Sequence, residues 1–345
     1  LMLAISRSRP IGVVLGAAVV CLSLTGAGAA QTAGGESGGT QCGGYPAPAF
    51  PDLTPVAGAQ GSSTIASGFG DVEMPTAPEA ALGMYTTDVD ILIWLGFPLA
   101  GSQPIRSGNG YSEFPCFFPQ AQLEGITTFG NYPDYNYEAI LLAEPDFILN
   151  GLGYDEAVNE RLPQIAPTYS VNAFDGRFWQ DHFEETAEAL GRPGRYGAWL
   201  EIYQTRLAEV RDLIGDADLV VSPLGYWDGT FSASCYVGVE CAVFEDLGLT
   251  IFEGALRNEG DGVALSPEEI GQFDVVDYAF IPISVGDEGL AAHATLMEEA
   301  ARNPLWARLN VVEDEHIVPF ELEMVFGSPS GQLAFLEVVA QTLSQ

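Results

Sequence analysis

The segment FGNYPDYNYEAILLAEPDFIL, residues 129–149, gives the clearest indication of how this chain of 345 residues folds. A loop rich in glycine, proline and asparagine leads into a short apolar helix that carries Glu138 near its start. Glu-Pro-Asp at 144–146 ends this helix, because proline has no backbone N–H to donate. The apolar run 147–149 is typical of a buried strand. Loop, helix and strand in this order predict an α/β unit.

Strands and helices alternate in two blocks of the chain, residues 71–176 and 217–345. We therefore expect two α/β lobes of comparable size. A helical segment, 177–216, lies between them, and in its second helix, 195–214, apolar residues recur at three- and four-residue steps. In the second block, Ser266 followed by a proline and two glutamates predicts the start of a helix.

Residues 1–30 have the features of a secretory signal peptide. Arg7 and Arg9 precede an uncharged apolar run, 11–24, which is shorter than the roughly 20 residues needed to span a bilayer. We therefore expect an exported, extracytoplasmic protein, located in the periplasm or at the cell surface. Residues 31–70 are rich in glycine, serine, threonine and proline, and we expect a flexible segment there.

The cysteines bear on export and on cross-linking. Neither Cys21 nor Cys42 is preceded by the small residue that lipid anchoring requires, so anchoring of the mature protein stays open. An exported chain with four cysteines after processing suggests two disulfides. Cys235 and Cys241 lie close in sequence and favour a local pair, which leaves Cys42 for Cys116. Two other pairings remain possible.

The charge of the chain excludes one class of partner. Its net charge is −35, and all of its basic residues are arginines. Binding to nucleic acid needs a concentrated basic face, so we expect no nucleic-acid partner. The acidic residues are interspersed with apolar ones, so the composition is not that of a disordered acidic tail.

Further segments carry the same resemblance as residues 129–149, each with a motif of its own. They are LSPEEI (265–270) followed by FDVVDYAFI (273–281), NPLWARLNVV (303–312) and, less completely, VFGSP (325–329). In this order they resemble the substrate-binding proteins of ABC importers for iron-siderophores and cobalamin. The resemblance covers most of the mature chain. It implies the class III periplasmic-binding-protein fold, in which one long helix, here 195–214, joins two α/β lobes.

The resemblance also implies partners. A ferric siderophore, or a similar iron chelate, would bind in the cleft between the lobes of a monomer. Glu138 in the first lobe and Glu268 in the second would dock on the membrane permease, because a carboxylate on each lobe can pair with a permease arginine. Cobalamin and haem are the alternative ligands within the same class of importer.

Ligand-binding candidates follow from their positions in loops after strands. Aromatic faces suit a large, partly apolar iron chelate, and arginine suits anionic catecholate or carboxylate oxygens. The candidates are Tyr85, Arg106, Tyr132 and Asn150 from the first lobe, and Tyr226, Trp227, Arg257 and Glu323 from the second.

Other functions find less support in the sequence. We expect no enzyme, because the chain lacks a G-x-S-x-G elbow, an H-E-x-x-H motif and a phosphate loop. A secreted α/β hydrolase and a surface adhesion module remain the alternatives outside the importer class. We expect neither a cofactor nor a metal site, since His182, His293 and His316 lie far apart and no C-x-x-C pair occurs.

Overall fold

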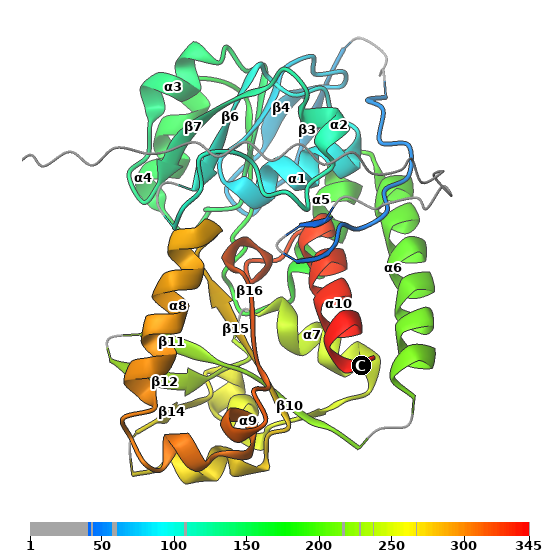
Figure 1. Ribbon diagram of the computed structural model, residues 1–345. Coiled ribbons are helices and arrows are strands. Elements are labelled where there is room, and N and C mark those ends of the chain that lie inside the picture. Colours follow the sequence, from blue (N-terminus) through cyan, green and yellow to red (C-terminus); the bar gives the residue numbers. More distant parts are fainter. Residues whose placement is uncertain are drawn as a thin grey trace, which may run out of the picture. The chain divides into compact units, whose positions relative to one another are not determined.

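The computed structural model describes residues 41–42, 44–56, 61–106, 109–215, 218–227, 229–236, 238–266 and 268–344. The first lobe is built on short parallel strands (Figure 1). The strands pair as β5 (Ala81–Gly83), β8 (Phe147–Asn150) and β9 (Thr168–Ser170), and as β6 (Ser102–Arg106) with β7 (Thr127–Tyr132). The helices are α1 (Thr86–Leu95), α2 (Gln120–Leu123), α3 (Tyr137–Leu142), α4 (Glu156–Arg161) and the 3-10 turn η1 (Leu162–Gln164).

The second lobe has a parallel sheet of its own. Its strand order is β13 (Thr250–Ile251), β10 (Val220–Pro223), β15 (Tyr278–Ile283) and β16 (Ile317–Glu321). A separate antiparallel sheet holds β11 (Gly225–Trp227), β12 (Thr230–Ala233) and β14 (Val263–Leu265). The α-helices are α7 (Val239–Leu247), α8 (Gly286–Ala300), α9 (Asn310–Glu313) and α10 (Pro329–Leu343). The 3-10 turns are η2 (Glu253–Leu256), η3 (Asn258–Gly260), η4 (Ile270–Val275), η5 (Trp306–Arg308) and η6 (Leu322–Met324).

Two helices, α5 (Trp179–Ala189) and α6 (Pro193–Ile214), lie between the lobes in the chain. The longer one, α6, has 22 residues and packs against α5 and α10 (Figure 1). Its buried residues, which include Trp199 and Tyr203, fall on the apolar face that the periodicity predicts. The predicted class, two α/β lobes with one long connecting helix, is confirmed.

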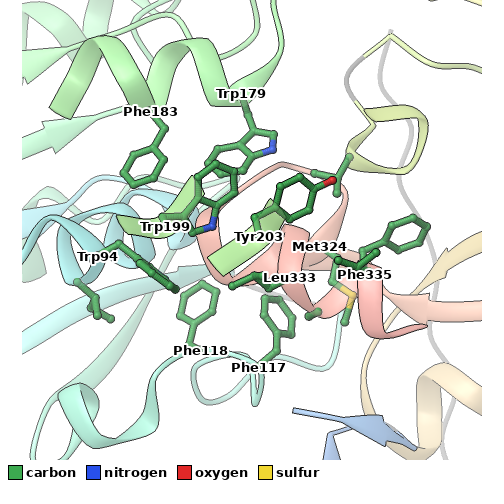
Figure 2. Packing of buried hydrophobic residues seen from close by; sticks show 14 of the residues in the cluster. Trp94, Phe117, Phe118, Trp179, Phe183, Trp199, Tyr203, Met324, Leu333 and Phe335 are labelled. Atoms are coloured by element: carbon green, nitrogen blue, oxygen red, sulfur yellow. The ribbon is translucent and has the colours of Figure 1, made fainter. Parts of the chain in front are cut away.

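One hydrophobic core is shared by both lobes and the connecting helices. Figure 2 shows Trp179 and Trp199 near Leu333 of α10, with Trp94 of α1 close by. The Trp179 and Trp199 rings lie 5.1 Å apart edge to face. Their indole N–H groups donate to the Gln332 side chain (2.6 Å) and the Pro329 carbonyl (3.0 Å) at the start of α10. The joint between the lobes is therefore both apolar and hydrogen-bonded.

The N-terminal segment differs from its prediction in the described parts of 31–70. Tyr45 and Leu53 are buried in the shared core, and the Val56 N–H donates to the Gly96 carbonyl (3.0 Å). β1 (Gln41–Cys42) pairs with β2 (Tyr45–Pro46), and β3 (Ser62–Ile65) pairs with β4 (Val72–Pro75). Because the segment is rich in small residues, its composition does not indicate that Tyr45 and Leu53 anchor it in the core.

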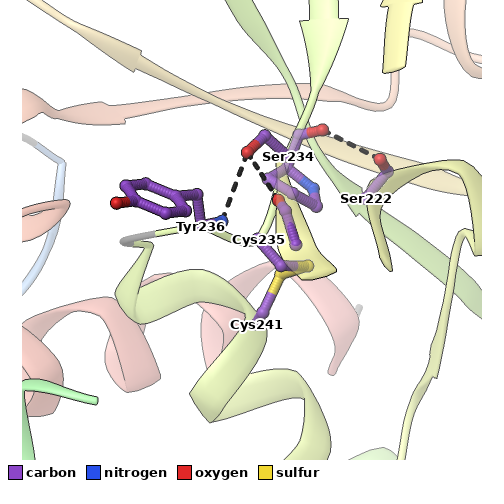
Figure 3. Close-up of a disulfide and its surroundings, with 7 residues drawn as sticks. Ser222, Ser234, Cys235, Tyr236 and Cys241 are labelled. Carbon is purple, nitrogen blue, oxygen red and sulfur yellow. Dashed lines mark hydrogen bonds between the residues drawn. A yellow bond between two sulfur atoms is a disulfide. The ribbon is translucent and has the colours of Figure 1, made fainter. Parts of the chain in front are cut away.

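The disulfide between Cys235 and Cys241 is present, as predicted, and ties the end of β12 to α7 (Figure 3). Cys116 is disulfide-bonded as well. The Cys42 side chain lies outside the described residues, so its pairing with Cys116 stays a prediction. At Ser266 the chain makes a turn that leads into the 3-10 turn η4 rather than the predicted helix.

Candidate functional site

A cavity of about 440 Å³ lies between the two lobes. Its first-lobe wall is formed by the segment that follows β6, and its second-lobe wall by residues at or just after the ends of β15 and β16. Loops after the carboxyl ends of parallel strands are where open α/β sheets bind ligands. The lining residues are Tyr45, Gly110, Tyr111, Ser112, Glu113, Phe114, Cys116, Ile283, Ser284, Val285, Gly286, Asp287, Leu290, Pro319, Phe320 and Glu321.

The lobes touch directly at one edge of this cavity. The Val285 N–H donates to the Asn109 carbonyl (3.0 Å), and the Asn109 side-chain amide lies 3.2 Å from the Ser284 hydroxyl. Gly110 makes this approach possible. Its φ is +83°, and a Cβ there would lie 2.5 Å from the Val285 carbonyl oxygen. A larger residue would therefore push the two walls apart.

Arg106, at the end of β6, is the centre of a buried cluster beside the cavity-lining segments. Its guanidinium forms an ion pair with Glu323 of η6 in the second lobe. The guanidinium carbon also lies over aromatic rings from both lobes, at 5.1 Å from Tyr85, 5.2 Å from Tyr132 and 4.3 Å from Phe326. One cation thus links the lobes by charge and by cation–π contact.

Local structure explains why these side chains meet. Tyr85 precedes α1, and the Asp88 carboxylate accepts hydrogen bonds from the Tyr85 and Gly151 N–H groups, both at 3.0 Å. Complete burial raises the pKa of Asp88 to about 7, although backbone hydrogen bonds, including the one from Gly151, lower it. The Thr86 hydroxyl accepts from the Arg106 N–H (3.0 Å), so the start of α1 and the end of β6 are tied together.

Glu321 is the half-buried acid of the cavity. Burial raises the pKa of its carboxyl to about 7, and the nearby charge of Glu323 adds to the effect, while hydrogen bonds from Tyr111 and Tyr45 oppose it. Burial is also the first cause of a raised pKa at both phenols. The Tyr111 hydroxyl accepts from the Glu323 N–H (3.1 Å), so it connects the cavity wall to the arginine cluster.

Glu323 has one carboxylate oxygen on Arg106, and the other has no hydrogen-bond partner among the described residues. Only 1 % of its side chain is exposed. Burial raises the pKa of Glu323, whereas the charge of Arg106 and its hydrogen bond lower it. The arginine is therefore the group that stabilises the ionised form of this carboxylate inside the protein.

The structure brings four predicted ligand residues together: Tyr85, Arg106, Tyr132 and Glu323. Asn150 does not join them. It is fully buried, and its amide donates to Asn159 and Ser170, both at 3.0 Å, so it serves the packing of the first lobe.

The remaining second-lobe candidates lie elsewhere. Tyr226 is 41 % exposed and packs against Phe231, with the two rings tilted, in a smaller pocket of the second lobe. Arg257 follows η2 and lies 3.9 Å from Glu253, an exposed carboxylate. The Trp227 side chain lies outside the described residues.

Sequence reasoning missed Tyr45, Tyr111 and Glu321. Glu321 is the last residue of β16, so the argument from strand ends applies to it. The sequence prediction names Glu323 at this strand end instead. Tyr45 belongs to the segment predicted to be flexible. Tyr111 lies within the Gly/Ser/Pro-rich stretch that follows β6.

The two predicted docking glutamates are exposed. Glu138 lies in the first turn of α3, a helix that begins where the Asn136 side chain accepts from the Ala139 N–H (3.0 Å). Leu141 and Leu142 on the same helix are 59 % and 74 % exposed. Glu268 lies in the turn before η4. Both carboxylates are available to a partner.

No helix within the described ranges is long and apolar enough to cross a membrane. No group of at least three His, Cys, Asp or Glu side chains in the same ranges is arranged to hold a metal ion.

The chain belongs to the periplasmic binding protein family, whose model matches residues 86–320. It is 21 % identical over 238 residues to the iron-uptake system-binding protein of Bacillus subtilis, a match that covers 68 % of this chain and 73 % of the relative. It is 22 % identical over 143 residues to the probable siderophore-binding lipoprotein YfiY of the same species. That match spans 41 % of this chain and only 42 % of the relative's length.

Solved structures share the fold. SirA of Staphylococcus aureus, complexed with staphyloferrin B, superposes with a TM-score of 0.63 at 20 % identity, covering 81 % of this chain and 98 % of its own. FeuA of Bacillus subtilis is a triscatecholate siderophore-binding protein, solved with ferri-bacillibactin. It superposes with a TM-score of 0.63 at 18 % identity, covering 82 % of this chain and 98 % of its own.

Proposed function

We propose that this chain is the extracytoplasmic substrate-binding protein of an ABC importer and that it captures a ferric siderophore between its lobes. The observation that carries the proposal is the cavity between lobes of the periplasmic-binding-protein fold, walled by strand-end loops from both. Its volume of about 440 Å³ lies within the usual range of small-molecule sites. The proteins it resembles in sequence and structure are named for siderophore binding or iron uptake.

The lining of the cavity supports an iron chelate. Phe114, Phe320 and Leu290 offer apolar surface for the linkers of a chelator, and Tyr111 and Ser284 offer hydroxyl groups for its polar atoms. Cobalamin and haem remain the second candidates of the same importer class. Catalysis is not part of the proposal, because the family model that matches the chain is that of periplasmic binding proteins.

Delivery to the permease completes the proposed function. Glu138 and Glu268 would pair with permease arginines, and exposed Leu141 and Leu142 would add apolar contact beside Glu138. An exposed ion pair contributes about 1 kcal/mol or less, so the two glutamates would orient the complex more than hold it. The signal-like residues 1–30 support export of the chain before it meets the permease.

Ligand binding is tested by quenching of tryptophan fluorescence in the purified mature protein. The panel contains ferric hydroxamates, ferric catecholates, ferric citrate, cobalamin and haem. Saturable quenching by an iron chelate at micromolar or lower concentration is expected. Saturation by cobalamin or haem alone would reassign the ligand, and no response from a folded protein would refute the proposed function.

Docking is tested by uptake of the chelate in cells whose own copy is replaced by the variant Glu138→Ala/Glu268→Ala. Uptake should fall, while affinity for the chelate stays unchanged because neither glutamate lines the cavity. Glu124→Ala/Glu313→Ala is the matched control, since it also removes one exposed glutamate from each lobe. Equal uptake by the two double variants would contradict the docking role.

A further inference from the structure

Resting on the proposed function, we infer that the cavity selects ferric chelates that are neutral or positively charged, of the hydroxamate class, and discriminates against anionic catecholate and carboxylate chelates. Three features of the described residues lead to this inference. They are the sign of the charges that line the cavity, the internal pairing of the neighbouring arginine, and the neutral donors and apolar groups that make up the rest of the wall.

All charged side chains that line the cavity are acidic. Glu113 comes from the first lobe, and Asp287 and Glu321 come from the second. Glu113 and Asp287 are exposed at the cavity, whereas Glu321 is half-buried. Water screens the first two more than the third. A chelate that enters this space therefore meets negative charge from both lobes, most strongly at Glu321.

The buried arginine beside the cavity-lining segments does not balance this charge. Arg106 is paired with Glu323 and is enclosed by Tyr85, Tyr132 and Phe326. An anionic ligand that drew the guanidinium away would leave Glu323 ionised and unpaired in a buried site, which is strongly unfavourable. The positive charge of Arg106 is thus neutralised by Glu323 inside the protein and is not available to the ligand.

The net charge of the ferric complex then decides which class of chelate the cavity favours. Three singly charged hydroxamates balance one ferric ion, so the complex is neutral, and an additional amine makes it cationic. Three doubly charged catecholates leave the complex with a large negative charge, which the acids at the cavity would repel. The hydroxamate oxygens of a neutral complex can instead accept hydrogen bonds from hydroxyl groups such as those of Ser112 and Ser284.

A charge series on one scaffold tests the inference. Ferrioxamine B carries a free amine; acetylation of the amine makes the complex neutral, and succinylation makes it anionic, while iron coordination stays the same. Calorimetry is done at low ionic strength and about pH 8, where Glu321, with its pKa near 7, is ionised. Affinity should fall by roughly fivefold or more between successive members, from amine to acetyl to succinyl.

Two variants assign the effect to the named side chains. Glu321→Gln should reduce the difference in affinity between the amine and succinyl compounds. Glu323→Gln should free Arg106 and raise affinity for the succinyl compound several-fold. Glu313→Gln removes an exposed glutamate that does not line the cavity and should leave the series unchanged.

The outcomes separate the two proposals. Equal or reversed affinities in the series, or tighter binding of a ferric triscatecholate than of all three compounds, would overturn the charge selection while siderophore capture stands. Failure of every iron chelate to bind a folded protein would overturn siderophore capture itself.

Discussion

Replacement of Arg106 by methionine should destabilise the protein because it strands a buried carboxylate. The Arg106 side chain is 9 % exposed and that of Glu323 is 1 % exposed, so the small energies typical of surface ion pairs do not apply. Removing one partner of a buried pair costs about 3–5 kcal/mol. Loss of the cation–π contacts adds about 1 kcal/mol. We expect a loss of about 4–6 kcal/mol in the free energy of unfolding near pH 8.

The same variant should be less defective in acid. Burial raises the pKa of Glu323, and the pKa should rise further once the guanidinium that lowers it is gone. A carboxyl whose folded pKa is raised contributes stability below its unfolded pKa and loses it as pH rises toward the folded value. At about pH 5 a larger fraction of Glu323 would be protonated in Arg106→Met than near pH 8, so the defect should be smaller.

Urea denaturation at the two pH values, followed by circular dichroism, measures both quantities. The double variant Arg106→Met/Glu323→Gln serves as the reference, because it removes both charges together. It should recover a large part of the loss seen in Arg106→Met near pH 8. A defect that is equal at both pH values, or a double variant as unstable as the single one, would refute the idea that the stranded carboxylate is the cause.

Three further predictions concern the cavity and the disulfide. Between about pH 6 and pH 8, affinity for an amine-bearing ferric hydroxamate should rise as Glu321 loses its proton, and calorimetry on Glu321→Gln should show a flat profile. Gly110→Ala should weaken chelate binding about tenfold, because the new Cβ meets the opposite wall and φ is positive. Gly101→Ala has open space and is the control; equal affinities would contradict the role of Gly110. Cys235→Ser/Cys241→Ser should lower the free energy of unfolding by about 2 kcal/mol, since the closed loop is short, and a urea midpoint equal to that of the parent would exclude this contribution.

Much of the fold is predictable because its signals are local. The Glu-Pro-Asp stop after α3, the apolar strand β8 and the apolar face of α6 all follow from spacing within a few turns. The helix predicted to begin at Ser266 is not formed, although its local signal is present. The Ser266 hydroxyl does accept from the Glu269 N–H (3.3 Å), as an N-cap would, but the chain continues as a 3-10 turn.

The site was predicted only in part, since it forms where two distant segments meet. Position after a strand identified Arg106 and Glu323 separately, but their pairing depends on how the lobes pack, and no local pattern encodes that contact. Asn150 also lies at a strand end, yet its neighbours Asn159 and Ser170 use its amide within the first lobe. Strand-end position is thus an informative signal for a cleft residue but not a sufficient one.

The core that both lobes share has a consequence for transport. Because Trp179 and Trp199 hold the start of α10 by hydrogen bonds and ring packing, the lobes have little freedom to swing apart when the cavity is empty. The spacing between Glu138 and Glu268 should then differ little between empty and loaded protein. We expect empty protein to occupy the permease almost as well as loaded protein, so that excess empty protein inhibits uptake. The rate of import would then depend on the fraction of the protein that carries a chelate, and not only on the total amount of chelate bound.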